Sequence, residues 1–555
     1  MRDLLVPSGE ARKVVFTHPR YSAHLEQLAA FGVLRACALE QVDRFGSYFS
    51  VPKTEEVDRS IFDGSHLSDL FIHPPPVSIP DISTVCHMIG EFALEQPTFY
   101  GFTVDIRHCF HQLPVHEGLG KKFGVHCAGK TYHFRVLPMG WCHSPAIAQS
   151  SGWALLSGRF PNQQAYFDED FMDDSELPTF IRTTPAAGFA ILYYDNFFVI
   201  TVCADLCERI FVRFRTNIEQ CGSAPFSEVT KDLTRFSHKT LRSNPVNFLG
   251  CEFACRPRRT RDHAGCEVTW RICPSKIPLE PTWTAEGSCR DIARRTGKIL
   301  RSLLLSLKPL GASELGRELL VMLSELGMQA STSGWDSSWS ATDQHHRILA
   351  AGLQRLQENQ WFSYEPSPTP NVILMSDASS IMCGWFIAQV SPPKLLAVRT
   401  SLWSPGLAKL DIFRREAFAA LSGILHVQRL TSEAFTVVVD NTAVAGVLRR
   451  LFSFCPLVNK WLQACSPWIA SPEVLTVVSA DNHADGLSRG EQTVVDIPAV
   501  LRLIQATREG RRTGTRTPHR FSSGIRHDDE FATYHAEQQS HGPAPTDEVP
   551  LDDSQ

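Results

Sequence analysis

A ten-residue run, ILYYDNFFVI at residues 191–200, constrains the fold of this chain more than any other feature. Two apolar stretches flank the polar pair Asp195 and Asn196, and this pattern is typical of a β-hairpin whose tip carries the polar residues. Such a hairpin would hold Asp195 at a fixed place beside a neighbouring strand. Most hairpins of this kind are only structural, so the meaning of Asp195 depends on what the rest of the chain carries.

Two earlier segments have a similar character. Asp105 ends an apolar run in FTVDIRHCFHQLPV, so a strand would deliver its carboxylate to a turn, and Phe110 follows five residues later. The segment LPMGWCHSPAIAQ, residues 137–149, has Gly140 where a tight turn needs it and Pro145 where a helix can begin. Each segment alone fits an ordinary turn or helix start, but three of them in this order are hard to obtain by accident.

Together the three segments resemble the reverse transcriptase family over about residues 50–255. Asp105 with Phe110 resembles motif A, residues 137–149 resemble motif B, and Tyr-Tyr-Asp-Asn resembles motif C, which is usually Tyr-x-Asp-Asp. Lys231 and the Phe-Leu-Gly at 248–250 stand where later palm motifs would fall. The resemblance implies an α+β right-hand polymerase with fingers, palm and thumb. It also implies that the incoming nucleotide is contacted by Lys53, Arg59, Phe110, Gly140 and Gln149.

The chemistry of phosphoryl transfer explains the residue types. Two divalent cations clamp the attacking and leaving oxygens, and magnesium prefers carboxylate ligands. The resemblance implies that Asp105 and Asp195 hold these ions, with Mg²⁺ expected and Mn²⁺ as an alternative. The bulky ring of Phe110 would leave no room for a 2′-hydroxyl, which favours deoxynucleotides.

Two features complicate the identification of motif C. Asn196 replaces the second aspartate and removes one negative charge near the metals. A competing motif C, Asp173 and Asp174 in FMDD, lies at a spacing from motif B nearer the family's usual one. No apolar strands flank FMDD, however, and a hairpin pressed into a palm needs such strands. The sequence therefore favours Asp195.

A second set of carboxylates follows in the C-terminal third. Asp377 ends an apolar strand, Glu416 lies in an apolar helix, Asp440 ends another strand, and Asp485 stands in SADNHADGLSRG. The ordered set resembles retroelement ribonuclease H over about residues 371–490, an α/β domain. That resemblance implies that the four carboxylates bind two magnesium ions for RNA cleavage, and His483 is a weaker candidate for proton transfer or product release.

A basic helix is predicted between the two resembling regions. Four cations recur at steps of four, four and three residues, which places them on one helical face: Arg290, Arg294, Lys298 and Arg301. A solvated basic face is the ordinary interpretation of such a pattern. Its place after a palm favours a thumb helix that follows the nucleic-acid backbone.

The length and composition bound the domain organisation. The chain has 555 residues, 43% of them hydrophobic, which suggests three or four domains rather than wholesale disorder. The net charge of −5 matters less than local basic stripes. The 16 cysteines form no CxxC pair, and no run is long and apolar enough for a membrane span, so we expect reduced thiols in an intracellular protein of the cytoplasm or nucleus. The predicted parts are a helical extension (1–45), fingers and palm (46–273), a helical thumb and connection (274–365), the ribonuclease H-like domain (366–495) and a disordered tail (506–555).

The resemblance implies an RNA-directed DNA polymerase with ribonuclease H, of the retrotransposon type. Its partners would be an RNA template, a DNA primer, the RNA–DNA hybrid and deoxynucleoside triphosphates, with no membrane. The NHADGLSR ending, with no obvious protease or integrase, points to DIRS-like or VIPER-type elements. Two rivals stay open: a decayed or repurposed copy that binds nucleic acid without polymerising, and an RNA-dependent RNA polymerase, which Phe110 and the ribonuclease H resemblance disfavour.

Overall fold

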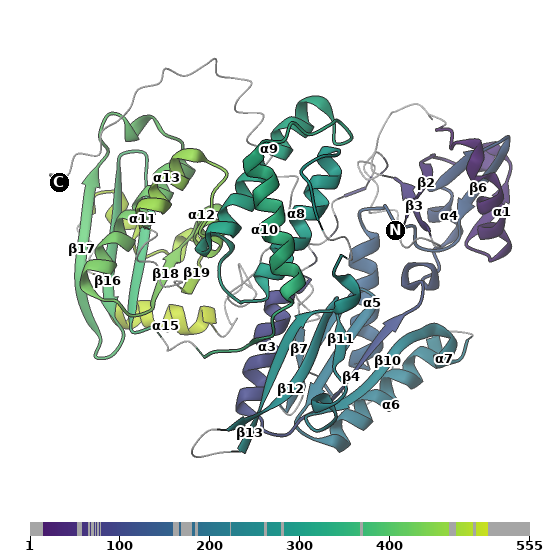
Figure 1. The fold of residues 1–555 in the computed structure, drawn as a ribbon, viewed down its shortest axis with the longest axis horizontal. Helices are drawn as coiled ribbons and strands as arrows, with labels where there is room; N and C mark the ends of the chain where they lie inside the picture. The colour runs from purple at the N-terminus through teal and green to yellow at the C-terminus, as the bar shows by residue number, and fades with distance from the viewer. Residues whose placement is uncertain are drawn as a thin grey trace. The chain divides into compact units, whose positions relative to one another are not determined.

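The structure is a computed structural model, and it contains helices and strands in both of its compact units (Figure 1). One unit comprises Met1–Pro80, Ala93–Leu249 and Phe253–Cys266; the other comprises Asp81–Phe92, Gly250–Glu252 and Glu267–Gln555. The residues that the structure describes are 15–52, 58–64, 67, 71–72, 74, 77, 79–158, 166–167, 180–183, 187–221, 224–259, 264–278, 282–366, 370–465, 473–491 and 495–508.

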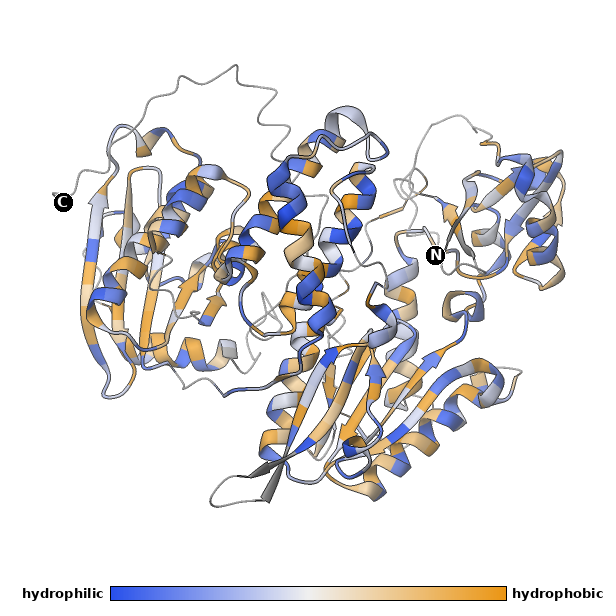
Figure 2. Ribbon diagram, viewed as in Figure 1, coloured by the Kyte–Doolittle hydropathy of each residue, from blue (hydrophilic) through white to orange (hydrophobic). Residues whose placement is uncertain are grey.

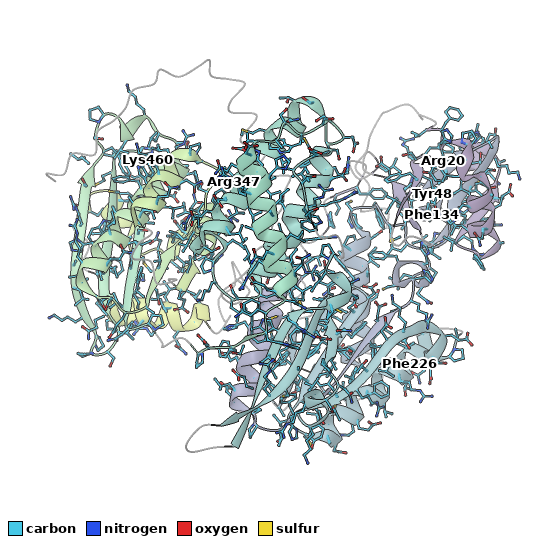
Figure 3. All side chains as sticks on the ribbon, viewed as in Figure 1. Arg20, Tyr48, Phe134, Phe226, Arg347 and Lys460 are labelled. Atoms are coloured by element: carbon cyan, nitrogen blue, oxygen red, sulfur yellow. The ribbon has the colours of Figure 1, made fainter. Side chains whose placement is uncertain are left out.

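The first unit begins with a small region of strands and one helix. Helix α1 (Ser22–Ala30) packs against the sheet β1-β6-β5, formed by Leu34–Cys37, Lys130–Phe134 and Gly124–Cys127. A separate ribbon pairs β2 (Ser47–Pro52) with β3 (Asp58–Asp63). The side chains of Tyr48 and Phe134, labelled in Figure 3, belong to the buried cluster of this region.

The prediction of a helical extension over 1–45 is correct for α1 but wrong for residues 34–37. Residues 34–37 form β1, which pairs antiparallel with β6 about a hundred residues later in the chain. The pairing of these residues with a distant strand decides the structure.

A five-stranded antiparallel sheet forms the centre of the first unit. Its order is β10-β4-β9-β8-β7, and its bounds are Thr230–Ser237, Tyr100–Ile106, Asn196–Thr201, Gly188–Tyr193 and Phe180–Arg182. Helices α5 (Ser144–Ser157) and α6 (Ala204–Cys221) pack against the sheet. Alternate strand residues such as Phe102 and Val104 point into the core with helix residues such as Trp153. The predicted hairpin at 191–200 is thus β8 and β9 of this sheet.

Short elements complete this unit: the 3-10 turns η2 (Pro19–Tyr21), η3 (Leu39–Gln41), η4 (Cys109–Gln112) and η6 (Thr240–Arg242), helices α4 (Glu117–Gly120) and α7 (Phe226–Val229), and strand β11 (Val246–Phe248). Strands β12 (Cys251–Arg259) and β13 (Ala264–Ile272) include residues of both units, as does helix α3 (Ile82–Glu95).

The second unit contains a helical part and a sheet part. Helices α8 (Cys289–Leu304), α9 (Glu314–Ser333) and α10 (Asp343–Glu358) pack on one another, with η7 (Pro274–Lys276) and η8 (Leu310–Ala312) beside them in the chain. Strand β14 (Phe362–Ser363) pairs with the end of β13. Ser288 caps α8 by accepting a hydrogen bond from the Asp291 backbone N–H, which explains where this helix begins.

The sheet part has the order β17-β16-β15-β18-β19. Its strands span Lys394–Leu402, Met382–Gln389, Val372–Ala378, Phe435–Val439 and Glu473–Thr476. The first three strands are antiparallel, whereas β15, β18 and β19 run parallel. Figure 2 colours much of these strands as hydrophobic, which fits a sheet buried on both faces.

Helices cover both faces of this sheet. Helices α11 (Ile412–Leu430), α12 (Thr442–Arg450) and α13 (Pro456–Cys465) pack with Leu374 and Val437 on one face. The alternate residues Ile373 and Met375 pack on the other face, toward α15 (Ile497–Arg508) and the short α14 (Asp485–Ser488). This arrangement is an α/β architecture, and its helix α15 lies beyond residue 495, at which the predicted domain ends.

The predicted disordered tail over 506–555 is wrong for residues 506–508, which belong to α15. Residues 509–555 lie outside the described part of the chain. None of the described helices is long and apolar enough to cross a membrane.

Candidate active sites

The central sheet brings Asp105 and Asp195 together. Asp105 lies near the end of β4, directly opposite Asn196 at the start of β9, and Asp195 occupies the β8–β9 turn. The Ile106 backbone N–H donates to the Asp195 carbonyl oxygen at 2.8 Å, which ties the hairpin tip to β4. Two carboxylates distant in sequence thus lie at one end of neighbouring strands.

Gln149 holds this hairpin in place. Its Nε2 donates to the Leu192 carbonyl at 2.9 Å, and its Oε1 accepts from the Tyr194 N–H at 3.0 Å. Tyr194 has a φ of 54°, a left-handed conformation that these two hydrogen bonds support. The sequence predicted a nucleotide contact at Gln149. The structure instead buries Gln149 completely and uses both ends of its amide for the hairpin.

Lys231 adds a positive charge to the pair. It is the β10 partner of Asp105, and its Nζ lies 3.2 Å from Asp105 Oδ2. Asp105 Oδ1 is buried and accepts no hydrogen bond from the residues that the structure describes. Burial and the Asp195 charge raise the pKa of Asp105 to about 6, and Lys231 offsets part of this effect. The sequence placed Lys231 only loosely, because a lysine on a strand says little without its cross-strand partner.

Asn196 belongs to the same group. Its Nδ2 donates to Asp195 Oδ1 at 2.8 Å, so the amide is bonded to the neighbouring carboxylate. The side-chain contact fixes one oxygen of Asp195.

Phe110 and Gly140 make different contacts: Phe110 contacts the hairpin residue Tyr194, whereas Gly140 contacts β3. Phe110 is half-buried on η4, and its ring centroid is 6.2 Å from that of Tyr194. Gly140 has a φ of 120°, and a Cβ there would overlap the Phe62 carbonyl oxygen, so the backbone requires glycine. This close approach joins the 137–149 segment to β3.

Three further predictions about nucleotide and metal contacts concern residues that lie wholly or partly outside the described part of the chain. Lys53 and the competing pair Asp173 and Asp174 lie outside the described residues. Arg59 lies in β3 opposite Val51, but its side chain is outside the description. Their roles stay predictions.

The second sheet assembles the other four carboxylates. Asp377 lies near the end of β15 and is 7% exposed; Asp440 directly follows the parallel neighbour β18. Glu416 lies in α11, and Asp485 begins α14. Burial, followed by the charges of Asp440 and Asp377, raises the pKa of Glu416 to about 8. Burial also raises the pKa of Asp377, to which the nearby charges of Asp440 and Asp485 contribute.

The NHADGLSR segment is held in place by its own polar residues. Asn482 Nδ2 donates to the Ser376 carbonyl at 3.1 Å, which attaches the segment to β15. Ser488 Oγ donates to Asp377 Oδ2, and Arg489 Nη2 lies 2.8 Å from Asp485 Oδ1. The sequence singled out Asp485 in this motif; the supporting roles of Asn482, Ser488 and Arg489 needed the structure. His483 is half-exposed beside them.

The predicted basic face lies on α8, and its cations are exposed. Arg290 is paired with Asp336 at 2.8 Å, and Arg294 lies 3.4 Å from Asp291. Lys298 Nζ lies 5.9 Å from the centre of the Trp283 ring. A surface pocket along this helix is lined by Pro278, Trp283, Asp291, Arg294, Arg295, Gly297, Lys298 and Arg301.

The carboxylate oxygens of the first site are candidate ligands for a metal ion. Among the described residues, no three His, Cys, Asp or Glu side chains are grouped so as to hold a metal ion. Magnesium, however, is often held by one or two carboxylates together with substrate phosphates. Asp105 Oδ1 fits that mode of binding, because it is buried near Asp195 and has no hydrogen-bond partner in the described part of the chain.

No protein-family model matches the chain, and no curated protein matches it. Among solved structures, a foamy viral protease-reverse transcriptase dRH with double-stranded DNA aligns with a TM-score of 0.42 at 13% identity, over 89% of this chain and 74% of that one. The foamy viral enzyme with an RNA/DNA hybrid gives 0.40 at 13%, over 89% and 58%. A third structure, with double-stranded DNA, gives 0.37 at 14%, over 86% of each chain. Likeness at this level does not assign a family.

Proposed function

We propose that this chain is an RNA-directed DNA polymerase with a ribonuclease H domain, from a retrotransposon. The observation that carries the proposal is the meeting of Asp105 and Asp195 at one end of neighbouring strands, with Lys231 at 3.2 Å from Asp105. A DIRS-like or VIPER-type origin is the finer part of the proposal, and it rests on the sequence motifs alone.

In the proposed reaction, the first unit extends a primer on an RNA or DNA template. The primer 3′-hydroxyl attacks the α-phosphate of a deoxynucleoside triphosphate, and pyrophosphate leaves. Asp105 and Asp195 would hold Mg²⁺ or Mn²⁺, and a bound ion would supply activation of the hydroxyl and neutralisation of charge on the phosphates. Lys231 compensates part of the carboxylate charge before the substrates arrive. Phe110 packs beside Tyr194 next to the carboxylates, where its ring would exclude a 2′-hydroxyl.

In the second unit, Asp377, Glu416, Asp440 and Asp485 would hold the metal ions for cleavage of RNA in the hybrid. The high pKa of Glu416 supports this role, because crowded carboxylates lose repulsion when a cation binds. Arg294, Lys298 and Arg301 on α8 would contact nucleic-acid phosphates. The proposed location is the cytoplasm or nucleus.

Primer extension by the purified chain on poly(rA)–oligo(dT) tests the polymerase. Wild type should extend the primer with Mg²⁺ or Mn²⁺, and Asp105→Asn and Asp195→Asn should each lose at least about 100-fold in rate. Asp205→Asn is the matched control, because Asp205 is exposed on α6, and its rate should stay within about twofold.

The other outcomes are equally informative. Extension that survives Asp195→Asn would move the metal site to Asp173 and Asp174. A folded wild type that binds the duplex but extends nothing with either metal would favour the second candidate, a copy that binds without polymerising. Asn196 is the observation that keeps this candidate open.

A further inference from the structure

Asn196 stands in a row of side chains across three strands. Lys231 on β10 pairs with Asp105 on β4, and Asp105 pairs with Asn196 on β9. Directly paired residues place their side chains on the same face of a sheet, with Cβ atoms about 5 Å apart. The charges along the row are therefore positive, negative and neutral.

The amide of Asn196 also satisfies the second carboxylate. Its Nδ2 donates to Asp195 Oδ1 at 2.8 Å, while the Asp195 carbonyl accepts from Ile106. Asn196 is thus the cross-strand neighbour of one aspartate and the hydrogen-bond donor to the other. Lys231 forms an ion pair with Oδ2 of Asp105.

A carboxylate at position 196 would change both relationships. It could not donate to Asp195 Oδ1, and it would add a third negative charge beside Asp105. Among the described residues, the buried Oδ1 of Asp105 already has no hydrogen-bond partner. Like charges this close destabilise a partly buried site unless a cation lies among them.

We propose that Asn196 is a positioning residue that lets this part of the sheet fold without a divalent cation, at the expense of weaker cation binding by Asp105 and Asp195. The inference rests on the proposed function for the identity of the metal site. In the metal-free protein the neutral amide donates a hydrogen bond to Asp195 and avoids the third negative charge that would otherwise require a bound cation.

Thermal unfolding of the full chain tests the inference, with the Asn196→Asp variant measured in EDTA and in millimolar MgCl₂. In EDTA this variant should melt about 3–5 °C below wild type, and Mg²⁺ should restore most of the difference. Wild type should respond to Mg²⁺ by less than about 2 °C. Binding of Mn²⁺, measured by electron paramagnetic resonance without nucleotide, should tighten at least about tenfold in the variant.

Two further variants control for the charge. Asn244→Asp makes the same chemical change at an exposed turn beyond the far end of β10, and it should behave like wild type in both buffers. The double variant Asp105→Asn with Asn196→Asp keeps the wild-type number of carboxylates, and it should melt near wild type in EDTA.

Equal melting of wild type and Asn196→Asp in EDTA would overturn the inference, as would an equal Mg²⁺ response in both. An Asn196→Asp chain that stays unfolded in Mg²⁺ while the double variant folds would overturn the claim that a divalent cation stabilises the variant site. Primer extension by wild type is scored separately: its absence would refute the polymerase, whereas the melting comparison depends only on carboxylates and cations.

Discussion

Individual carboxylates in both candidate sites are crowded and partly buried. Asp105 has a pKa raised to about 6 and Glu416 one raised to about 8, in each case first by burial and then by neighbouring aspartates. Clusters of buried, like-charged carboxylates destabilise the folded protein. They are therefore characteristic of functional sites, where the chemistry requires them.

Glu416 gives a pH-dependent prediction. Its folded-state pKa of about 8 lies above the ordinary value of 4.5, so the folded state holds the proton more tightly than the unfolded chain does. This contribution to stability is fully present below the ordinary value and is lost as the pH rises through about 8. In EDTA, Glu416→Gln should therefore exceed wild type in free energy of unfolding by about 2 kcal/mol near pH 9, with little difference near pH 4.

Urea unfolding at a series of pH values measures this difference. Glu433→Gln, a change at an exposed residue before β18, should follow wild type throughout. If Glu416→Gln and wild type lose stability in parallel as the pH rises, Glu416 is not the group responsible.

For individual residues, the sequence predicted the acidic side chains but not the residues that hold them in place. Asp105, Asp195 and Asp377 could be found because each ends or follows an apolar strand. Gln149 and Lys231 could not be assigned their roles, since both depend on partners that the fold brings in from distant segments.

Helix α8 carries a basic face. Its cations differ in how far a neighbouring carboxylate neutralises their charge. Arg290 is held by Asp336, whereas Lys298 lies beside the Trp283 ring. If this helix contacts a duplex, Lys298→Ala should reduce the slope of log K against log salt by about 1. Arg290→Ala should reduce it by less than about 0.5, because Asp336 already neutralises that charge.

Fluorescence anisotropy with an RNA–DNA hybrid over a range of salt measures these slopes. Lys239→Ala, at an exposed turn of the first unit, is the control and should leave the slope unchanged. Identical slopes for Lys298→Ala and wild type would exclude this face of α8 from the interface.

Local patterns predicted the elements well where neighbours in sequence pair with each other. The hairpin β8–β9 joins adjacent strands through a tight turn, so its two apolar runs identify it. Strand β1 pairs with β6 far along the chain, and nothing in residues 34–37 announces that partner. Element identity therefore followed from sequence only where the pairing was local.

For the whole molecule, the two candidate sites belong to different compact units. Asp105 and Asp195 lie in the first unit, whereas Asp377, Glu416, Asp440 and Asp485 lie in the second. The order of the motifs predicted this separation. It did not predict that residues 81–92 belong with the second unit, because no motif marks them.

The most direct test of the account uses one RNA–DNA hybrid with separate labels on the primer and the RNA, so that synthesis and RNA cleavage are read together. Wild type should do both, Asp105→Asn should cleave RNA without extending the primer, and Asp377→Asn should extend without cleaving. Loss of both activities in either variant, or of neither in both, would contradict two independent carboxylate sites in one chain.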